Sequence, residues 1–211
     1  MTNLVIVGVG GQRVITLGNL IARCALEAGL TVRGHAQSSL AVLGGSVTYH
    51  LRLGPSYSPF VPHGQADVIL ALELAETLRA VPYIKDGGLA LVSEDKKAPM
   101  NLILSHAHYP TPEEVAQIYR HLGARFILLP KENQKTQKGR ALPEAWRLLG
   151  VMSAVTSFWS RKKIEETIAA YRPREASLNL AAFRRGYQLA QEIEAKAAAS
   201  SPIEKAASAG K

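Results

Sequence analysis

Near its amino end the chain carries a cluster of glycines where backbone amides could bind an anion. The cluster is Gly8-Val9-Gly10-Gly11-Gln12-Arg13, and it follows the apolar segment Val5-Ile6-Val7, which predicts a buried strand. Apolar or small residues then recur at helical spacing from position 14 to position 25. Glycines allow a sharp turn and a close approach, while a helix N-terminus offers free N–H groups. The pattern predicts a turn between a strand and a helix that is suited to anion binding.

This turn differs at two places from the G-x-G-x-x-G fingerprint of nicotinamide dinucleotide enzymes. The third glycine would fall at position 13, where this chain has Arg13. No aspartate or glutamate ends the second predicted strand, Thr31 to Gly34, to hold the ribose hydroxyls. Arg33 could instead accept a 2′-phosphate, so a free-standing NADP-type reductase stays open as an alternative. A non-catalytic module that binds another anionic partner is a third interpretation.

A second glycine-rich segment, Gly44-Gly45-Ser46, leads into residues 47–53, where apolar and polar side chains alternate. That period of two predicts a strand with one solvated face, either at the edge of the sheet or antiparallel to its neighbours. We expect both glycine segments to lie at one edge of the sheet and to face one cleft. His50 on the solvated face and Glu73 after a buried strand are weaker candidates, because structural roles are more common for such residues.

The elements that position these residues alternate between strand and helix patterns. Strands are predicted at residues 4–7, 31–34, 47–53, 67–72, 89–92, 101–104 and 125–129, and helices at 14–28, 73–84 and 112–121, with two or three more from 143 to 195. The alternation predicts α/β architecture: a single Rossmann-like domain over residues 1–195, with a mostly parallel sheet, helices on both faces and a helical C-terminal third. The Ala-, Ser- and Lys-rich tail, 196–211, has little to bury and is expected to be disordered.

Composition narrows the class of protein. The 211 residues are 47% hydrophobic and 20% charged, with a single cysteine and a net charge of +8. These values indicate a globular, cytoplasmic protein without a disulfide, signal peptide or membrane span. The basic clusters lack interleaved aromatic residues, which favours an acidic partner subunit or a phosphate-bearing ligand over nucleic acid. We expect no metal site, because no cysteine pair or ligand cluster has suitable spacing.

Several motifs, in the same order along the chain, resemble the gamma subunit, or gamma-type domain, of 2-oxoacid:ferredoxin oxidoreductases. The enzymes of this group act on pyruvate, ketoisovalerate or indolepyruvate. The beta subunit of indolepyruvate ferredoxin oxidoreductase belongs to that group, and the chain resembles it in particular. The motifs span about residues 3 to 190 and are Gly8-Val9-Gly10-Gly11-Gln12, Gly44-Gly45-Ser46-Val47 with His50-Leu51-Arg52, Tyr57-Ser58-Pro59, Ala66-Asp67-Val68-Ile69-Leu70-Ala71, Leu148-Leu149-Gly150 and Asn179-Leu180-Ala181-Ala182-Phe183-Arg184-Arg185-Gly186.

The resemblance implies one component of a complex that oxidatively decarboxylates a 2-oxoacid, reduces ferredoxin and forms an acyl-CoA. Thiamine diphosphate and the iron–sulfur clusters would be carried by partner subunits, and this chain would be inactive alone, without a catalytic residue. Coenzyme A would bind at a shared site. There Arg13 would hold a phosphate or pair with a carboxylate of the partner, unless it points into solvent. The predicted cofactor-binding residues are Gly8, Gly10, Gly11, Gln12, Arg13, Gly44, Gly45 and Ser46.

The chain departs from the family pattern at three places. Arg13 replaces the usual glycine of G-G-Q-G, and Ala145 stands where an asparagine usually precedes L-L-G. The run Ser38-Ser39-Leu40-Ala41-Val42-Leu43 replaces the familiar H-G-M-A-Q-R. We expect these positions to meet the partner or line the shared cleft. A divergent complex, or a paralogue with an altered substrate, therefore stands beside a standard complex as an interpretation.

Overall fold

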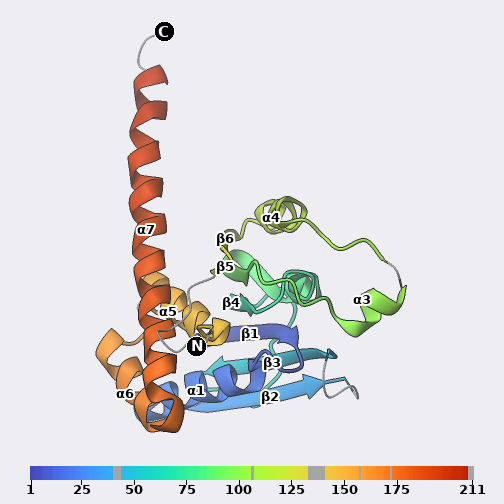
Figure 1. Cartoon of the computed structure of the whole chain (residues 1–211), viewed down its shortest axis with the longest axis vertical. Coiled ribbons are helices and arrows are strands. Elements are labelled where there is room, and N and C mark those ends of the chain that lie inside the picture. The colour runs from blue at the N-terminus through green and yellow to red at the C-terminus, as the bar shows by residue number, and fades with distance from the viewer. Residues whose placement is uncertain (40–43, 106, 133–140, 157, 172, 209–211) are drawn as a thin grey trace.

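The computed structural model describes residues 1–39, 44–105, 107–132, 141–156, 158–171 and 173–208. Within them a six-stranded sheet forms the centre of the molecule (Figure 1). Its spatial order is β2-β3-β1-β4-β5-β6. The strands are β1 (Thr2–Val9), β2 (Val32–Ser38), β3 (Ser46–Leu53), β4 (Ala66–Ala71), β5 (Ile84–Ser93) and β6 (Arg125–Leu129).

Strand direction divides the sheet into two parts. Strands β1, β4, β5 and β6 are parallel to one another, whereas β3 pairs antiparallel with both β1 and β2. The predicted mostly parallel sheet is confirmed, and so is the antiparallel direction of the strand at 47–53. That strand is not at the edge, because β2 lies beyond it. Placing β3 between β1 and β2 separates the first glycine loop from β2.

Helices cover both faces of the sheet, as predicted. On one face Leu4 and Ile6 of β1 pack in a core with side chains of α1, α5, α6 and α7. On the other face Val5 and Val7 share a second core with Ala80 of α2 and residues of α4. The helices are α1 (Val14–Glu27), α2 (Thr77–Ala80), α3 (Met100–Ser105), α4 (Pro112–His121), α5 (Glu144–Thr156), α6 (Arg161–Tyr171) and α7 (Ala176–Ser208), with 3₁₀ turns η1 (Val81–Tyr83) and η2 (Pro173–Glu175).

Two glycines let α5 and α7 cross with their backbones in contact. A Cβ added to Gly150 would overlap the carbonyl oxygen of Phe183, and a Cβ on Gly186 would overlap that of Arg147. Both neighbours are backbone atoms, which a rotamer change cannot move away. The glycines that end the L-L-G and R-R-G motifs therefore allow α5 and α7 to pack closely against each other.

Three predicted elements differ from the structure. The helix expected at 73–84 is reduced to α2 and η1, because Pro82 lies in the segment and β5 already begins at Ile84. Strand β5 is longer than the predicted 89–92, with a register shift against β4 around Asp86-Gly87-Gly88. The strand expected at 101–104 is wrong. These residues form α3, since β6 pairs directly with β5 and the Pro99 carbonyl accepts the first helical hydrogen bonds.

Helix α7 continues past the boundary predicted at residue 195. Its backbone is helical through Ser208, and its far end extends away from the sheet and the other helices (Figure 1). Alanine, lysine and glutamate, which are frequent in this stretch, favour a helical backbone. The division into a domain at 1–195 and a tail at 196–211 stays a prediction. None of the described helices is both long and apolar enough to cross a membrane.

Candidate functional site

Gln12 ties the first glycine loop to the end of a neighbouring strand. Its side-chain oxygen accepts a hydrogen bond from the Val9 amide at 2.8 Å, and its side-chain nitrogen donates to the Leu72 carbonyl at 2.8 Å. Gly8 leaves room for this arrangement, because a Cβ there would lie 2.9 Å from the Gln12 oxygen and 2.9 Å from Val14. Gly8 and Gln12 therefore set the shape of the loop.

The second glycine segment lies against the first. The Gly10 amide donates to the Gly45 carbonyl at 2.8 Å. Because β3 is antiparallel to β1, the start of β3 lies beside the end of β1, at one end of the strands. The sequence analysis expected both glycine segments there. Gly11 and Gly44 have φ values of +96° and +76°, which glycine adopts with little strain.

Arg13 occupies a backbone conformation suited to the glycine it replaces. Its φ of 69° makes it the one described non-glycine residue with a positive φ. The guanidinium donates to the Glu175 carboxylate at 2.8 Å, and the two side chains are 32% and 30% exposed. Arg13 thus pairs with a carboxylate of its own chain, in η2, which the sequence did not predict. This ion pair joins the glycine loop to the C-terminal helices.

Two clefts flank the loop at the carboxyl ends of the parallel strands, where α/β sheets commonly bind ligands. The first has a volume of about 330 Å³, and its described lining combines the cations Arg13, Lys97 and Lys131 with the carboxylates Asp95, Glu132 and Glu144, beside Gln12 and Ala145. The second, of about 530 Å³, is lined by Val9, Gly10, Gly11, Arg13, Val14, Ile15, Thr16, Ser38, Ser39 and Val47. Gly44, Gly45 and Ser46 line neither of these two clefts, and their part in binding stays a prediction. Residues 40–43 of the divergent run lie outside the described residues.

A buried glutamate lies beside the second glycine segment. The Ser46 hydroxyl donates to Glu76 Oε1 at 2.8 Å, and Arg79 Nε lies 3.2 Å from the same oxygen. Glu76 Oε2 is buried without a hydrogen-bond partner. Burial raises the pKa of Glu76 above its usual value, against the lowering effect of Ser46 and Arg79. Glu76 therefore holds a proton more readily than an exposed glutamate does.

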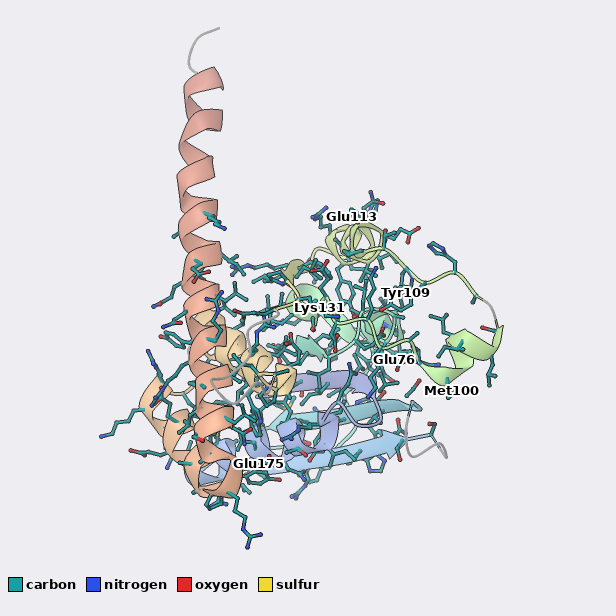
Figure 2. The ribbon with its side chains drawn as sticks, viewed as in Figure 1. Glu76, Met100, Tyr109, Glu113, Lys131 and Glu175 are labelled. Atoms are coloured by element: carbon teal, nitrogen blue, oxygen red, sulfur yellow. The ribbon has the colours of Figure 1, made fainter. Side chains whose placement is uncertain are left out.

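A second buried glutamate, Glu73, anchors the segment before α4. Its carboxylate accepts hydrogen bonds from the Glu76 amide at 2.8 Å and from the Tyr109 hydroxyl. Burial raises the pKa of Glu73, and burial together with the Glu73 carboxylate raises that of Tyr109. Glu76 and Tyr109 lie on the same side of the sheet as Met100 of α3 (Figure 2). A structural role for Glu73 fits this geometry, although no sequence pattern pointed to Tyr109 as its partner.

Sequence reasoning missed a charge network around the buried Arg147, whose members Ser93, Glu132 and Glu144 line the first cleft. Arg147 is 2% exposed and lies 2.7 Å from Glu144 Oε2 and 3.3 Å from Glu132 Oε2. It also donates to the Pro130 carbonyl, while Ser93 donates to Glu144. The network joins the segment after β6 to the start of α5. The i, i+3 spacing of Glu144 and Arg147 was a visible signal, but burial could not be read from it.

His50 and Arg33 do not belong to the glycine loop. His50 is 1% exposed, accepts the Val61 amide at its Nδ1 and packs edge-on against Tyr83. Burial lowers its pKa, so the neutral form is favoured in a structural role. In the sheet, Arg33 of β2 pairs with Arg52 of β3, and Arg52 pairs with Asn3 of β1. Asn3 lies about 16 Å along the strand from Gly8. Arg33 is therefore too far from the glycine loop to bind the 2′-phosphate of a dinucleotide held there, as the NADP-type alternative requires.

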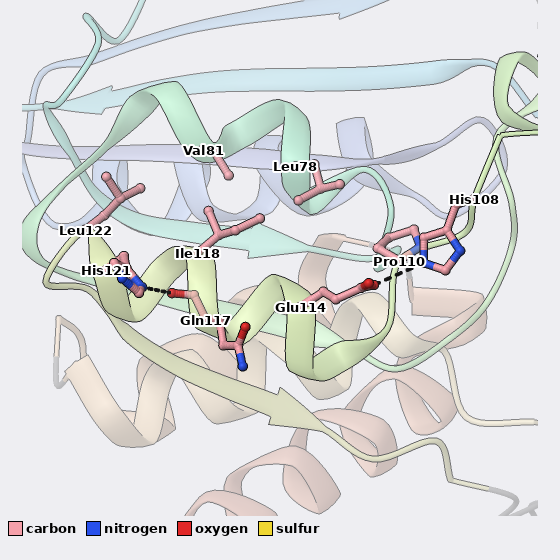
Figure 3. Close-up of a pocket in the computed structure, with 9 residues that line it drawn as sticks. All are labelled: Leu78, Val81, His108, Pro110, Glu114, Gln117, Ile118, His121 and Leu122. Carbon is pink, nitrogen blue, oxygen red and sulfur yellow. Dashed lines mark hydrogen bonds and ion pairs between the residues drawn. The ribbon is translucent and has the colours of Figure 1, made fainter.

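An apolar groove of about 680 Å³ lies between α2 with η1 on one side and α4 on the other (Figure 3). Leu78 and Val81 face Ile118 and Leu122 across it. His108 at its rim pairs with a carboxylate oxygen of α4 at 3.1 Å. None of the predicted cofactor-binding residues lines this groove.

The site as a whole offers binding groups rather than a reacting set. Around the glycine loop it presents the side chains of Arg13, Lys97 and Lys131, which suit an anion, next to the carboxylates of Asp95, Glu132 and Glu144. Among the described residues no group of three or more histidine, cysteine or acidic side chains could hold a metal ion. Of the two buried glutamates, Glu73 accepts the Glu76 amide and so holds a backbone turn, whereas Glu76 bonds the Ser46 and Arg79 side chains.

Comparison with known proteins establishes the family. The family described as pyruvate ferredoxin/flavodoxin oxidoreductase matches residues 3–189. The chain belongs to this family. The indolepyruvate oxidoreductase subunit IorB of Thermococcus kodakarensis is 34% identical over 195 residues, covering 90% of this chain and 96% of the relative. The IorB subunit of Archaeoglobus fulgidus is 33% identical over 190 residues, covering 89% and 94%.

Solved structures show the same fold at lower identity. The keto/oxoacid ferredoxin oxidoreductase gamma subunit from Geobacter sulfurreducens superposes with a TM-score of 0.65 at 20% identity, covering 91% of this chain and 99% of that one. The 2-oxoglutarate:ferredoxin oxidoreductase from Magnetococcus marinus, solved with 2-oxoglutarate, coenzyme A and succinyl-CoA bound, gives 0.67 at 18% identity. The superposition covers 90% of this chain but 31% of the longer Magnetococcus chain. The family fold thus occurs both as a separate chain and as part of a larger one.

Proposed function

We propose that this chain is the subunit without thiamine diphosphate in a 2-oxoacid:ferredoxin oxidoreductase complex. The observation that carries the proposal is the family match over residues 3–189, together with 34% identity to an IorB subunit that the chain covers almost completely. The complex would oxidatively decarboxylate a 2-oxoacid to an acyl-CoA and transfer the electrons to ferredoxin. The names of the relatives favour indolepyruvate as the 2-oxoacid.

The site geometry fits an auxiliary role for this chain. Its glycine loop is held by contacts to its own backbone, the buried Glu73 holds a turn, and the buried Glu76 bonds Ser46. Thiamine diphosphate and the iron–sulfur clusters would belong to one or more partner chains, which would contribute the reacting groups. The chain alone would be inactive.

Coenzyme A is the proposed ligand of the shared site. In the 330 Å³ cleft, Arg13, Lys97 and Lys131 would hold one part of that molecule, such as its diphosphate, beside the carboxylates of Asp95, Glu132 and Glu144 that also line it. A partner would enclose the rest. Arg13 already has a carboxylate partner, so it would contribute by shared or exchanged hydrogen bonds. Coenzyme A is chosen as the ligand because it is bound in the Magnetococcus enzyme, whose longer chain includes this fold.

Purification of the tagged chain from its native cell tests the proposal. We expect one or more co-purifying chains that contain thiamine diphosphate and iron, with both cofactors in fixed ratio to the tagged chain. Recovery of the tagged chain alone, while 2-oxoacid:ferredoxin activity stays in the depleted extract, would contradict it. Titration of the chain with NADPH addresses the alternative, which requires binding in the micromolar range, about −8 kcal/mol.

A further inference from the structure

Ser46, the first residue of β3, lies behind the wall of the second cleft. The next residue, Val47, lines that cleft, and consecutive side chains of a strand point to opposite faces of the sheet. The Ser46 side chain accordingly points away from the cleft, and its hydroxyl donates to Glu76 Oε1 at 2.8 Å. Glu76 directly precedes α2 and is 1% exposed. A buried carboxylate therefore supports the start of β3 from the face opposite the cleft.

The backbone around Ser46 holds both sides of the second cleft. The Ser46 carbonyl accepts the Ser39 amide at 3.0 Å, and Ser39 lines the cleft just after β2. The preceding carbonyl, that of Gly45, accepts the Gly10 amide at 2.8 Å, and Gly10 lines the cleft from the first glycine loop. A displacement of Ser46 would therefore move both walls.

The first glycine loop extends this support to the proposed coenzyme A site. Gly11 and Arg13 come within three residues of Gly10, and both line the two clefts. Arg13 is one of the cations that would hold coenzyme A under the proposed function. Its position relative to the ligand depends on where the loop is held, and the bond from Gly10 to Gly45 is one of the contacts that hold it.

Glu76 is itself fixed in place. Its amide donates to the Glu73 carboxylate at 2.8 Å, and Arg79 Nε lies 3.2 Å from the same oxygen that receives the Ser46 hydroxyl. The other oxygen, Oε2, is buried without a hydrogen-bond partner. A carboxylate buried in this way is costly for stability, and such costs concentrate at functional sites. The arrangement therefore points to a role beyond packing.

We propose that Glu76 is a positioning residue for coenzyme A: through Ser46 and Gly45 it holds the first glycine loop where Arg13 meets the ligand. The inference rests on the proposed function and adds a residue that touches neither the ligand nor the reacting atoms. It also gives Ser46 an indirect part in binding, through the shape of the loop rather than by contact.

Steady-state kinetics of the purified complex test the inference with Glu76→Ala, Ser46→Ala and the double variant. We expect the KM for coenzyme A to rise about fivefold in each single variant, as loss of one hydrogen bond predicts, with kcat and the KM for the 2-oxoacid unchanged. The double variant should show no further rise, because both changes remove the same bond. Glu76→Gln should restore most of the affinity, since its amide oxygen can accept the Ser46 hydroxyl.

Thr77→Ala is the matched control. Thr77 follows Glu76 and is equally buried, but its hydroxyl donates to the Glu73 carbonyl and not to the glycine segment. This variant should lose stability without a change in either KM. Amide hydrogen exchange of the isolated chain gives a second measurement: the Gly10 amide should exchange faster in Glu76→Ala and Ser46→Ala than in the wild type or Thr77→Ala.

Four results would overturn the inference. The first is a wild-type KM for coenzyme A in both single variants, and the second is an equal rise in Thr77→Ala, which would show a general loss of stability near α2. The third is an additive effect in the double variant, and the fourth is unchanged exchange of the Gly10 amide. If the wild-type complex uses no coenzyme A, the proposed function fails instead, and the exchange measurement still decides whether Glu76 holds the loop.

Discussion

The guanidinium of Arg13 lies 2.8 Å from the carboxylate of Glu175, 162 residues later in the chain. This contact connects the loop after β1 to the turn before α7. Arg13 holds it from a left-handed backbone conformation that disfavours any residue with a Cβ. The departure from the glycine of the family pattern thus combines a backbone cost with an ion pair inside the chain.

Replacing Arg13 separates these two effects. Arg13→Ala keeps the unfavourable φ and loses the ion pair, whereas Arg13→Gly loses the pair but relieves the backbone. A half-exposed pair is worth about 0–1 kcal/mol, and the left-handed conformation costs about 1–2 kcal/mol. We therefore expect Arg13→Gly to be more stable than Arg13→Ala by about 1 kcal/mol in urea unfolding. Equal or reversed stabilities would contradict the assigned backbone conformation.

The crossing of α5 and α7 should tolerate no side chain at its glycines. Gly150→Ala and Gly186→Ala each place a methyl group on a backbone carbonyl, so we expect losses of about 3 kcal/mol in the free energy of unfolding. Gly87→Ala is the control, because it has a positive φ but nothing within 4 Å, and should cost about 1 kcal/mol. A loss at Gly150 or Gly186 no larger than at Gly87 would mean that the helices are not in close contact.

The lysines of the first cleft should affect coenzyme A more than the 2-oxoacid. Lys97→Ala and Lys131→Ala each remove a cation from its lining. In the purified complex we expect the KM for coenzyme A to rise about tenfold for each, as loss of a charged contact predicts. The KM for the 2-oxoacid should stay unchanged. Lys162→Ala on α6 is the control, and its KM values for coenzyme A and for the 2-oxoacid should both stay unchanged. Unaltered coenzyme A kinetics in both cleft variants would remove this chain from the coenzyme A site.

Glu76 should make the stability of the protein depend on pH. Its folded-state pKa is raised by burial, so its contribution is fully present below the usual glutamate pKa of about 4.3 and is lost as pH rises through the folded value. The glutamine in Glu76→Gln cannot ionise. The free energy of unfolding of this variant should therefore rise relative to that of the wild type as pH increases. Urea unfolding across a pH series measures this difference.

Glu114 provides the opposite case. The Thr111 amide and then His108 lower its pKa, so its contribution is present above the usual glutamate pKa and is lost as pH falls. Glu114→Gln should therefore lose stability relative to the wild type at neutral pH and approach it in acid. A constant difference across the pH series for both variants would contradict the assigned environments.

The sequence predicted most of the sheet because its central strands are short apolar runs between strong turn signals. It also predicted that the two glycine segments face one cleft, which stays a prediction, although the start of β3 lies beside the end of β1. It failed at 101–104, where an apolar run of strand length forms α3. Periodicity cannot separate these choices in so short a segment.

Only part of the candidate site could be predicted from the sequence. The glycines and Gln12 could be found because their spacing is local. The partners of Arg13 and Arg147 could not, because Glu175 and Glu132 come from distant segments that the folded chain brings together. Burial of Glu76 likewise depends on packing that no local pattern encodes.

Reconstituted turnover tests the central claim most directly. Reduction of ferredoxin by a 2-oxoacid and coenzyme A should be measured with this chain alone, with the thiamine-containing partner alone, and with both. We predict activity when both are present, none above background from this chain alone, and little from the partner alone. Activity of this chain by itself, or full activity of the partner without it, would contradict its assignment as a necessary subunit of the complex.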